Sequence, residues 1–236
     1  LEKLKALDLV EEAYIEPVPE LASIITTTDI SANDVITAPG AETSDTPDYE
    51  FRQGYLAEAP SGIDAYHAWN IPGGRGEGVK IVDIEFAMDT NHEDLPDLFF
   101  ASGIDETSYR DHGTAVMGVI GSVNNGFGTT GIAHNAQIGF ASHQVAGMAE
   151  AIRDAADAVG RGGVIILEVH YSSSVSVNCS CNSSQCGFVP AEFLSANYSA
   201  IRYAVEMGVI VIQAAGNGSA NLDDPRYVSA YNMEGR

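Results

Sequence analysis

Asp83, His112 and Asn217 are the side chains in this sequence whose types and settings could together support nucleophilic chemistry. Asp83 lies inside the apolar run IVDIE, His112 begins the segment HGTAVMGVIG, and Asn217 ends AAGN. An imidazole can take a proton from a nucleophile when a carboxylate orients it, and a fixed amide can stabilise the oxyanion that forms. Each residue also has a plainer interpretation: a strand-end cap, a helix cap, and a turn Asn before Gly218.

Short runs rich in Val and Ile alternate with amphipathic stretches from about residue 53 onward. Strands are predicted at 79–84, 138–142, 164–169 and 209–215, with helices at 148–159 and 200–207 and another beginning near His112. Strands that are each followed by a helix indicate an α/β fold, a mostly parallel, doubly wound sheet with helices on both faces. Functional groups gather at the carboxyl ends of such strands. The sequence therefore places the three polar residues where a site can form.

The net charge excludes some classes of partner. The 236 residues include 33 Asp and Glu but only 11 Lys and Arg, a formal charge of −22. Nucleic acid and anionic membrane surfaces would repel such a chain, so neither is expected as a partner. No apolar run approaches the roughly 20 residues that span a bilayer.

The segments VDIE, HGTAVMG and AAGN, in that order and at strand ends, resemble the subtilisin-like serine proteases over residues 53–236. The resemblance implies a serine endopeptidase acting on protein or peptide substrates. In it, Asp83 orients the base, His112 is the general base and acid, and Asn217 stabilises the tetrahedral intermediate. The family usually has a Gly soon after the catalytic Asp, whereas Ile84 to Phe86 follow here.

The family's nucleophile motif, Gly-Thr-Ser followed by small residues and Pro, does not occur after Asn217 in this sequence. The resemblance therefore covers an incomplete catalytic domain. The nucleophilic Ser is expected downstream of Arg236 or on a second chain. The alternative is a catalytically silent domain that acts as a binding module, because a fold does not establish activity.

The beginning of the chain fits the same resemblance. VEEAYIEPVPE looks like the end of a subtilase propeptide, which gives a propeptide tail at residues 1–19. Residues 20–52, rich in Pro, Thr, Ser and acidic residues, have the composition of a flexible linker that is open to proteolysis. The catalytic part follows at 53–236. We expect a zymogen whose linker is cut during maturation.

The resemblance also implies a substrate groove. Its lining residues would be Glu168, Val169, His170, Ala214, Ala215 and Gly216. The family usually has small residues in the segment that here reads LEVHY. Glu168 and His170 are therefore expected to narrow the first specificity pocket or make it acidic, and an acidic pocket would favour a basic residue before the scissile bond.

A calcium site is a further expectation. NHEDL at 91–95 and the loop NNGFGTTG at 124–131 resemble the high-affinity calcium site of subtilisins, with Asp94 and Asn125 at ligand positions and Gln53 as a weaker candidate. Oxygen ligands around a loop suit this cation. The alternative is an ordinary Asn-Gly turn beside a surface Asp.

Three cysteines, Cys179, Cys181 and Cys186, lie within one short stretch. A local disulfide in a surface insertion is the favoured interpretation, and the remaining thiol could hold a second chain. A zinc site would need a fourth ligand, and none occurs at a recognisable spacing. A disulfide and the acidic composition favour a secreted, extracellular protein.

Overall fold

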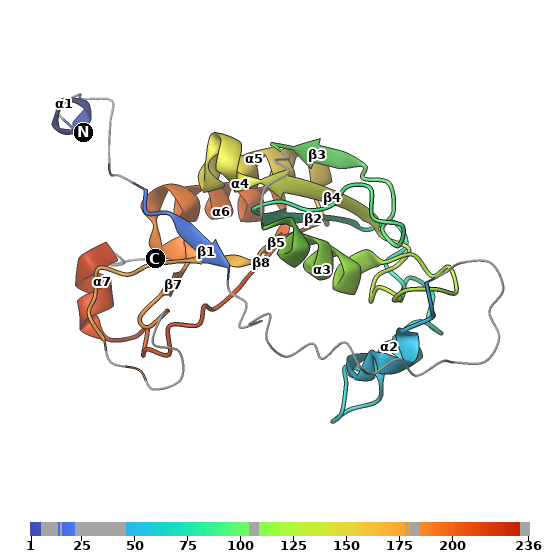
Figure 1. Ribbon diagram of the computed structural model, residues 1–236. Coiled ribbons are helices and arrows are strands. Elements are labelled where there is room, and N and C mark those ends of the chain that lie inside the picture. The colour runs from blue at the N-terminus through green and yellow to red at the C-terminus, as the bar shows by residue number, and fades with distance from the viewer. Residues whose placement is uncertain are drawn as a thin grey trace.

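The computed structural model describes residues 1–5, 14, 16–21, 46–103, 109–177, 179 and 185–231 (Figure 1). Most of the linker expected at 20–52 lies outside these residues, as does Cys181. Among the described residues, the catalytic region expected from residue 53 onward contains one five-stranded sheet and two strands of a smaller sheet.

A five-stranded parallel sheet forms the centre of the molecule. Its order is β3 (Phe100–Ser102), β4 (Gln137–Ser142), β2 (Lys80–Glu85), β5 (Val164–Leu167) and β8 (Ile210–Gln213). Every neighbouring pair is parallel. Both faces of the central strands β2 and β4 are covered, so nearly every residue of these two strands is buried. The predicted α/β class and parallel sheet are confirmed.

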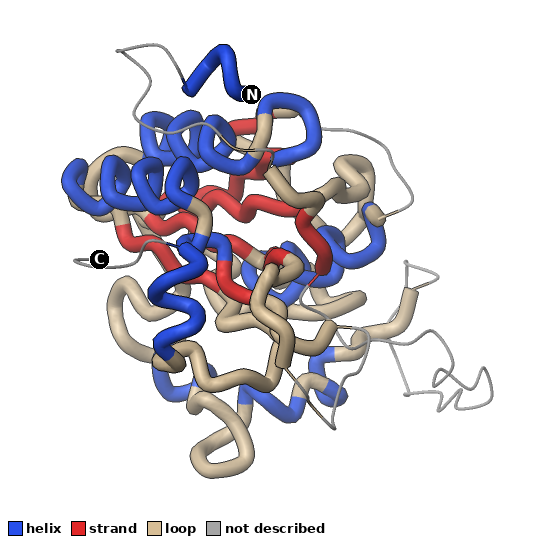
Figure 2. The backbone as a smooth tube through the Cα atoms, turned by 90° about the vertical axis from the view of Figure 1, so that its left-hand side faces the viewer, coloured by secondary structure: helices blue, strands red, loops and turns tan. Residues whose placement is uncertain are grey.

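Helices cover the two faces of the sheet, giving three layers (Figures 1 and 2). On one face, α5 (Met148–Val159) and α6 (Ser195–Met207) bury a large core with Val82 and Ile84 of β2. On the other face, α3 (Arg110–Gly121) packs Met117 against Ile81. Residues Ile81, Asp83 and Glu85 therefore point to the α3 side, because side chains alternate along a strand.

A second, smaller sheet is antiparallel and lies beyond the end of β5. It consists of β1 (Pro19–Leu21), β6 (Val169–Tyr171) and β7 (Val189–Pro190), in that order. The strand predicted at 164–169 is thus broken: Leu167 ends its part of the main sheet, and Val169 begins a strand that pairs elsewhere. The helix predicted at 200–207 begins earlier, at Ser195.

The remaining elements are short. They are α1 (Glu2–Lys5), α2 (Ala65–Ala68), α4 (His143–Ala146), α7 (Pro225–Tyr231) and the 3₁₀ turns Glu50–Arg52, Gly54–Leu56 and Ala191–Phe193. Among the helices that the structure describes, none has the length and apolar character needed to cross a membrane.

Edge strand β8 exposes a large apolar surface. Ile210 and Ile212 point to the same side and remain 54% and 53% exposed. An apolar edge of this kind is a hazard for self-association. We predict that residues 1–236 expressed alone are poorly soluble and that the double variant Ile210→Lys/Ile212→Lys stays monomeric at higher concentration.

Light scattering measures this difference. The matched control is Val145→Lys, at an exposed valine on α4 away from the edge. A wild-type chain that is monomeric and soluble at the same concentration would contradict the prediction.

Candidate active site

A short contact joins a carboxylate and an imidazole at the carboxyl end of β2. Glu85 Oε1 lies 2.6 Å from His112 Nδ1, and the Glu85 side chain has no exposed surface. The second Glu85 oxygen accepts a hydrogen bond from the Phe86 backbone N–H at 3.1 Å. His112 lies in the first turn of α3 with its side chain 12% exposed. The imidazole is therefore held from inside and reaches solvent at its other end.

Close packing places α3 against the end of β2. A Cβ on Gly113 would lie 2.2 Å from the Ala87 carbonyl oxygen, so only glycine allows this approach. Thr114 Oγ1 also accepts a hydrogen bond from the Asp89 N–H at 2.8 Å. The small residues after His112 thus bring its ring down to the strand end.

Asp83 is two residues earlier on the same face of β2. It is fully buried, and neither of its carboxylate oxygens has a hydrogen-bond partner. Burial raises its pKa well above the usual value, and the charges of Glu85 and Glu168 raise it further. The surroundings of Asp83 therefore disfavour its charged form.

These contacts correct one expectation. Asp83 was predicted to orient His112, but the structure gives that contact to Glu85, the last residue of β2. A signal for Glu85 existed in the sequence, since 83 and 85 share one face of the strand and 85 is nearer the functional end. The Asp was preferred because the family resemblance prescribes that residue type.

Glu168 belongs to the same electrostatic cluster. It directly follows the β5 residue Leu167, which pairs with Ile84, so its neighbour across the sheet is Glu85. Burial raises the pKa of Glu168, while His112 lowers it. For His112, burial alone lowers the pKa, but the hydrogen bond and charge of Glu85, and the charge of Glu168, leave it raised. Burial likewise raises the pKa of Glu85, against the effect of His112.

The expected groove residues lie on two neighbouring segments. Val169 and His170 are buried in β6, and the 214–217 segment follows β8, with the Ala214 N–H donating to the Leu167 carbonyl at 2.9 Å. His170 bridges the two segments, because its Nδ1 accepts the Asn217 N–H at 3.1 Å. The Asn217 side-chain amide donates to Gln185 Oε1 at 3.0 Å. An amide nitrogen carries two hydrogens, so this bond does not by itself prevent Asn217 from donating to an oxyanion.

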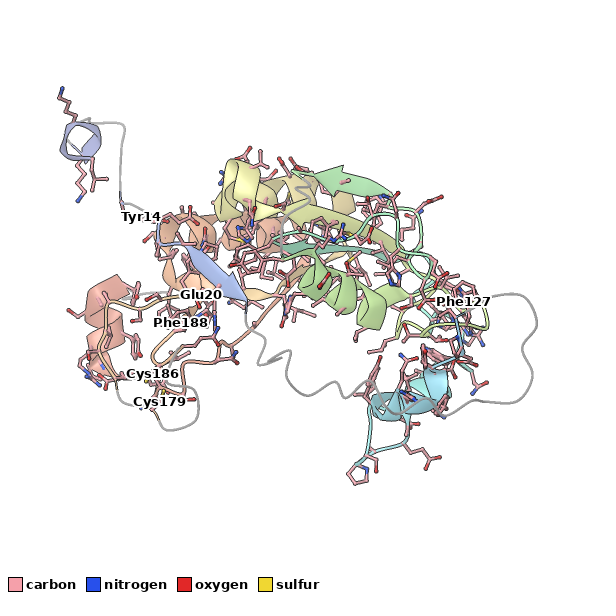
Figure 3. The ribbon with its side chains drawn as sticks, viewed as in Figure 1. Tyr14, Glu20, Phe127, Cys179, Cys186 and Phe188 are labelled. Carbon is pink, nitrogen blue, oxygen red and sulfur yellow. The ribbon has the colours of Figure 1, made fainter. Side chains whose placement is uncertain are left out.

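The amino-terminal segment occupies the outer side of this groove. β1 pairs antiparallel with β6, with Pro19 opposite Tyr171, Glu20 opposite His170 and Leu21 opposite Val169. Tyr171 also donates its hydroxyl hydrogen to Glu16 Oε1 at 3.1 Å. Figure 3 labels Glu20 in β1 and Phe188 just before β7, the strands on the two sides of β6. An extended peptide thus adds a strand to β6.

The residues expected to bind calcium are arranged around a buried carboxylate. Asp94 is 4% exposed, and its oxygens accept hydrogen bonds from Thr129 N–H at 2.7 Å, Thr129 Oγ1 at 3.0 Å and Asn125 Nδ2 at 3.3 Å. A Cβ on Gly128 would lie 2.4 Å from Asp94 Oδ2, so the loop closes tightly over it.

Gln53 does not join Asp94. Its side-chain oxygen accepts from the Thr130 N–H at 2.8 Å, and its amide donates to the Thr130 carbonyl at 2.9 Å. Among the described residues, no three acidic, His or Cys side chains form a metal-binding group. A cation here would therefore depend on Asp94, Asn125 and neutral oxygens. The Asp94 carboxylate has more lone pairs than its hydrogen bonds use, so it could still bind a cation.

Cys179 and Cys186 lie near each other at the β7 end of the molecule (Figure 3). Cys186 Sγ donates a weak hydrogen bond to the Val177 carbonyl at 3.3 Å. Pairing among the three cysteines stays a prediction, because Cys181 is outside the described residues.

A buried carboxylate beside an imidazole at a strand end, inside a three-layer parallel α/β sheet, defines the class: an α/β protein with a candidate acid–base site at the carboxyl ends of its strands. The sequence identifies the family within that class. Residues 57–233 match the sequence profile of the Subtilase family (peptidase S8), and the chain belongs to this family of serine proteases.

Two curated proteins are similar over most of this chain. A "Thermophilic serine proteinase" from Bacillus sp. (strain AK1) is 28% identical over 76% of the chain and 43% of its own length. The "Minor extracellular protease Epr" of Bacillus subtilis (strain 168) is 30% identical over 83% of the chain and 27% of its own length. The chain therefore spans less than half the length of these relatives.

Solved structures give weaker matches. The Prenylagaramide maturation protease PagA has a TM-score of 0.47 at 18% identity, covering 65% of this chain and 50% of that one. A cold adapted subtilisin-like serine proteinase has a TM-score of 0.41 at 23% identity, covering 66% and 54%.

The Glu85 contact generates a test by NMR titration. Replacing Glu85 with Gln removes the carboxylate that stabilises the imidazolium, so the pKa of His112 should fall. Asp83→Asn is the matched control, because neither Asp83 oxygen has a hydrogen-bond partner and the pKa of His112 should change much less. A larger fall in Asp83→Asn would return the orienting role to Asp83.

Proposed function

We propose that this chain carries the acid–base half of a secreted serine endopeptidase that hydrolyses peptide bonds through an acyl-enzyme. The observation that carries the proposal is the 2.6 Å contact between buried Glu85 and His112 beside a strand that binds an extended peptide. Family membership supports it.

His112 acts in this proposal as general base and then general acid. Glu85 contacts Nδ1, which fixes the orientation of the ring and stabilises the imidazolium that forms. Nε2 is then the nitrogen that faces the nucleophile. Asp83 takes no direct part. Asn217 donates a hydrogen of its side-chain amide to the oxyanion of the tetrahedral intermediate.

The nucleophilic Ser comes from outside the 236 residues, either downstream of Arg236 or on a second chain. Among the Ser residues present, Ser172 to Ser174 and Ser219 lie in the wrong order or context for the family's motif. A catalytically silent binding domain is the second candidate, because none of these Ser residues fits the family's nucleophile motif and a fold does not establish activity.

Residues 1–19 are proposed as the tail of an inhibitory propeptide. Support comes from β1, which lies on β6 as a substrate strand would, and from the Glu16 contact with Tyr171. Cutting of the 20–52 linker then separates this strand from the catalytic part. A secreted location is proposed from the cysteine cluster and from the extracellular relative.

Active-site labelling tests the endopeptidase proposal. In the native, active preparation, a fluorophosphonate probe should label a Ser on a peptide outside residues 1–236. His112→Ala should abolish both labelling and hydrolysis, whereas the exposed His67→Ala should retain them. Labelling of a Ser within 1–236 would overturn the assignment, and no labelling of a folded full-length protein would favour the silent domain.

Calcium is proposed to stabilise the loop around Asp94. A ligand that binds only the folded state at a hundredfold excess over Kd contributes about 2.7 kcal/mol, a Tm increase of roughly 5–10 °C for a chain of this size. A chelator should therefore lower Tm by this amount in the full-length protein. Asp94→Asn should remove most of that sensitivity.

The control for this measurement is Asp97→Asn, which alters an exposed carboxylate three residues away. An equal Tm with and without chelator would contradict the calcium proposal. If Asp94→Asn then still lowered Tm, the role of Asp94 would be limited to its hydrogen bonds with Thr129 and Asn125.

A further inference from the structure

The space between β6 and the 214–217 segment is filled by one side chain. His170 has no exposed surface, its Nδ1 accepts the Asn217 N–H at 3.1 Å, and its ring packs edge-on against Phe188 at 4.7 Å between centroids. A Cβ on Gly216 would lie 3.3 Å from His170 Nδ1 and 3.5 Å from His170 Cβ. The His170 side chain would therefore crowd even a methyl group at position 216.

The pairing of β1 shows which substrate residue meets this ring. Glu20 lies opposite His170 and Leu21 opposite Val169. In a substrate of the same register, the next residue faces Glu168, whose charge acts on His112. Under the proposed function, this residue supplies the carbonyl that is attacked, because it is the one nearest the acid–base pair. Its side chain shares a face with the residue opposite His170, since side chains alternate along a strand, and so points toward the space between β6 and the 214–217 segment, the first specificity pocket implied by the family resemblance.

We propose that His170 is a specificity-determining residue that fills this pocket, so that the protease cuts after small residues such as Ala and Gly. The proposal rests on the proposed endopeptidase function. It also predicts a processing site within this sequence: the residue after Leu21 is Ala22, so the bond cut in the linker is Ala22–Ser23.

The expected preference for a basic residue is replaced by this proposal. Glu168, which was to supply the acidic pocket, belongs to the cluster with Glu85 and His112 instead. Burial lowers the pKa of His170 to about 4, so the ring is neutral near pH 7 and offers no charge to a substrate. Its effect on the substrate is therefore steric, and shortening the side chain should reverse it.

Peptides Pro-Glu-Leu-X-Ser-Ile, which copy residues 19–24 with X at position 22, test the pocket in the active full-length protein. Wild type should hydrolyse X = Ala at least ~100-fold faster in kcat/KM than X = Phe or Lys, a range that steric exclusion of a side chain can reach. His170→Gly should reduce the Ala-to-Phe ratio to below ~10. His134→Ala, whose ring packs on Trp69, should leave the ratio unchanged.

His170→Ala repeats the test if the glycine variant does not fold. Equal hydrolysis of X = Ala and X = Phe by wild type would overturn the proposal. So would an unchanged ratio in a folded His170→Gly or His170→Ala protein.

A second arm uses the chain's own linker and mass spectrometry of its new amino terminus. Ala22→Phe should block cleavage at position 22, and His170→Gly should restore it in the double variant, while Ala22→Gly stays processed. Cleavage of Ala22→Phe at the same bond in wild-type His170 would contradict the proposal.

A binding arm separates failure of the pocket from failure of the proposed function. If no peptide is cut and no Ser is labelled, the endopeptidase proposal fails. Calorimetry with the products Pro-Glu-Leu-Ala and Pro-Glu-Leu-Phe then still tests the pocket. Wild type should prefer the Ala peptide, and His170→Gly should bind both; equal binding by wild type would overturn it.

Discussion

The ion pair between Glu85 and His112 is the interaction on which the site depends. A buried carboxylate is costly unless it has a charged or hydrogen-bonding partner, and removing that partner leaves an uncompensated charge. Glu85 has two such partners, the imidazole at 2.6 Å and the Phe86 N–H. The fold satisfies this requirement by ending β2 where the first turn of α3 begins to pack, through Gly113.

Charge balance then limits what the surrounding residues can do. Glu85 and Glu168 act on one imidazole, while burial and these two carboxylates raise the pKa of Asp83. Each ionised carboxylate near His112 favours the imidazolium. Because the free base is the reactive form, these charges move the working range of the base to higher pH. Glu85 and Glu168 thus tune the same histidine.

The groove depends on the break between β5 and β6. Residues up to Leu167 belong to the parallel sheet, whereas Val169 to Tyr171 turn to an antiparallel partner, the amino-terminal strand β1. The break lets Glu168 face the base while His170 closes the space beside Gly216. One short segment therefore serves the chemistry and the recognition of a peptide.

The sequence by itself determined the α/β class, the parallel strands and the place of His112 at the start of a helix, because apolar runs and small residues after a histidine are local patterns. It did not distinguish Asp83 from Glu85, since both share a face of β2 and only packing of α3 decides which carboxylate meets the ring. It also did not show that Glu168 faces the base and His170 the pocket, or that Gln53 bonds to Thr130 instead of Asp94. These outcomes come from contacts between residues far apart in the chain, where alternation along a strand gives the direction of a side chain but not its partner.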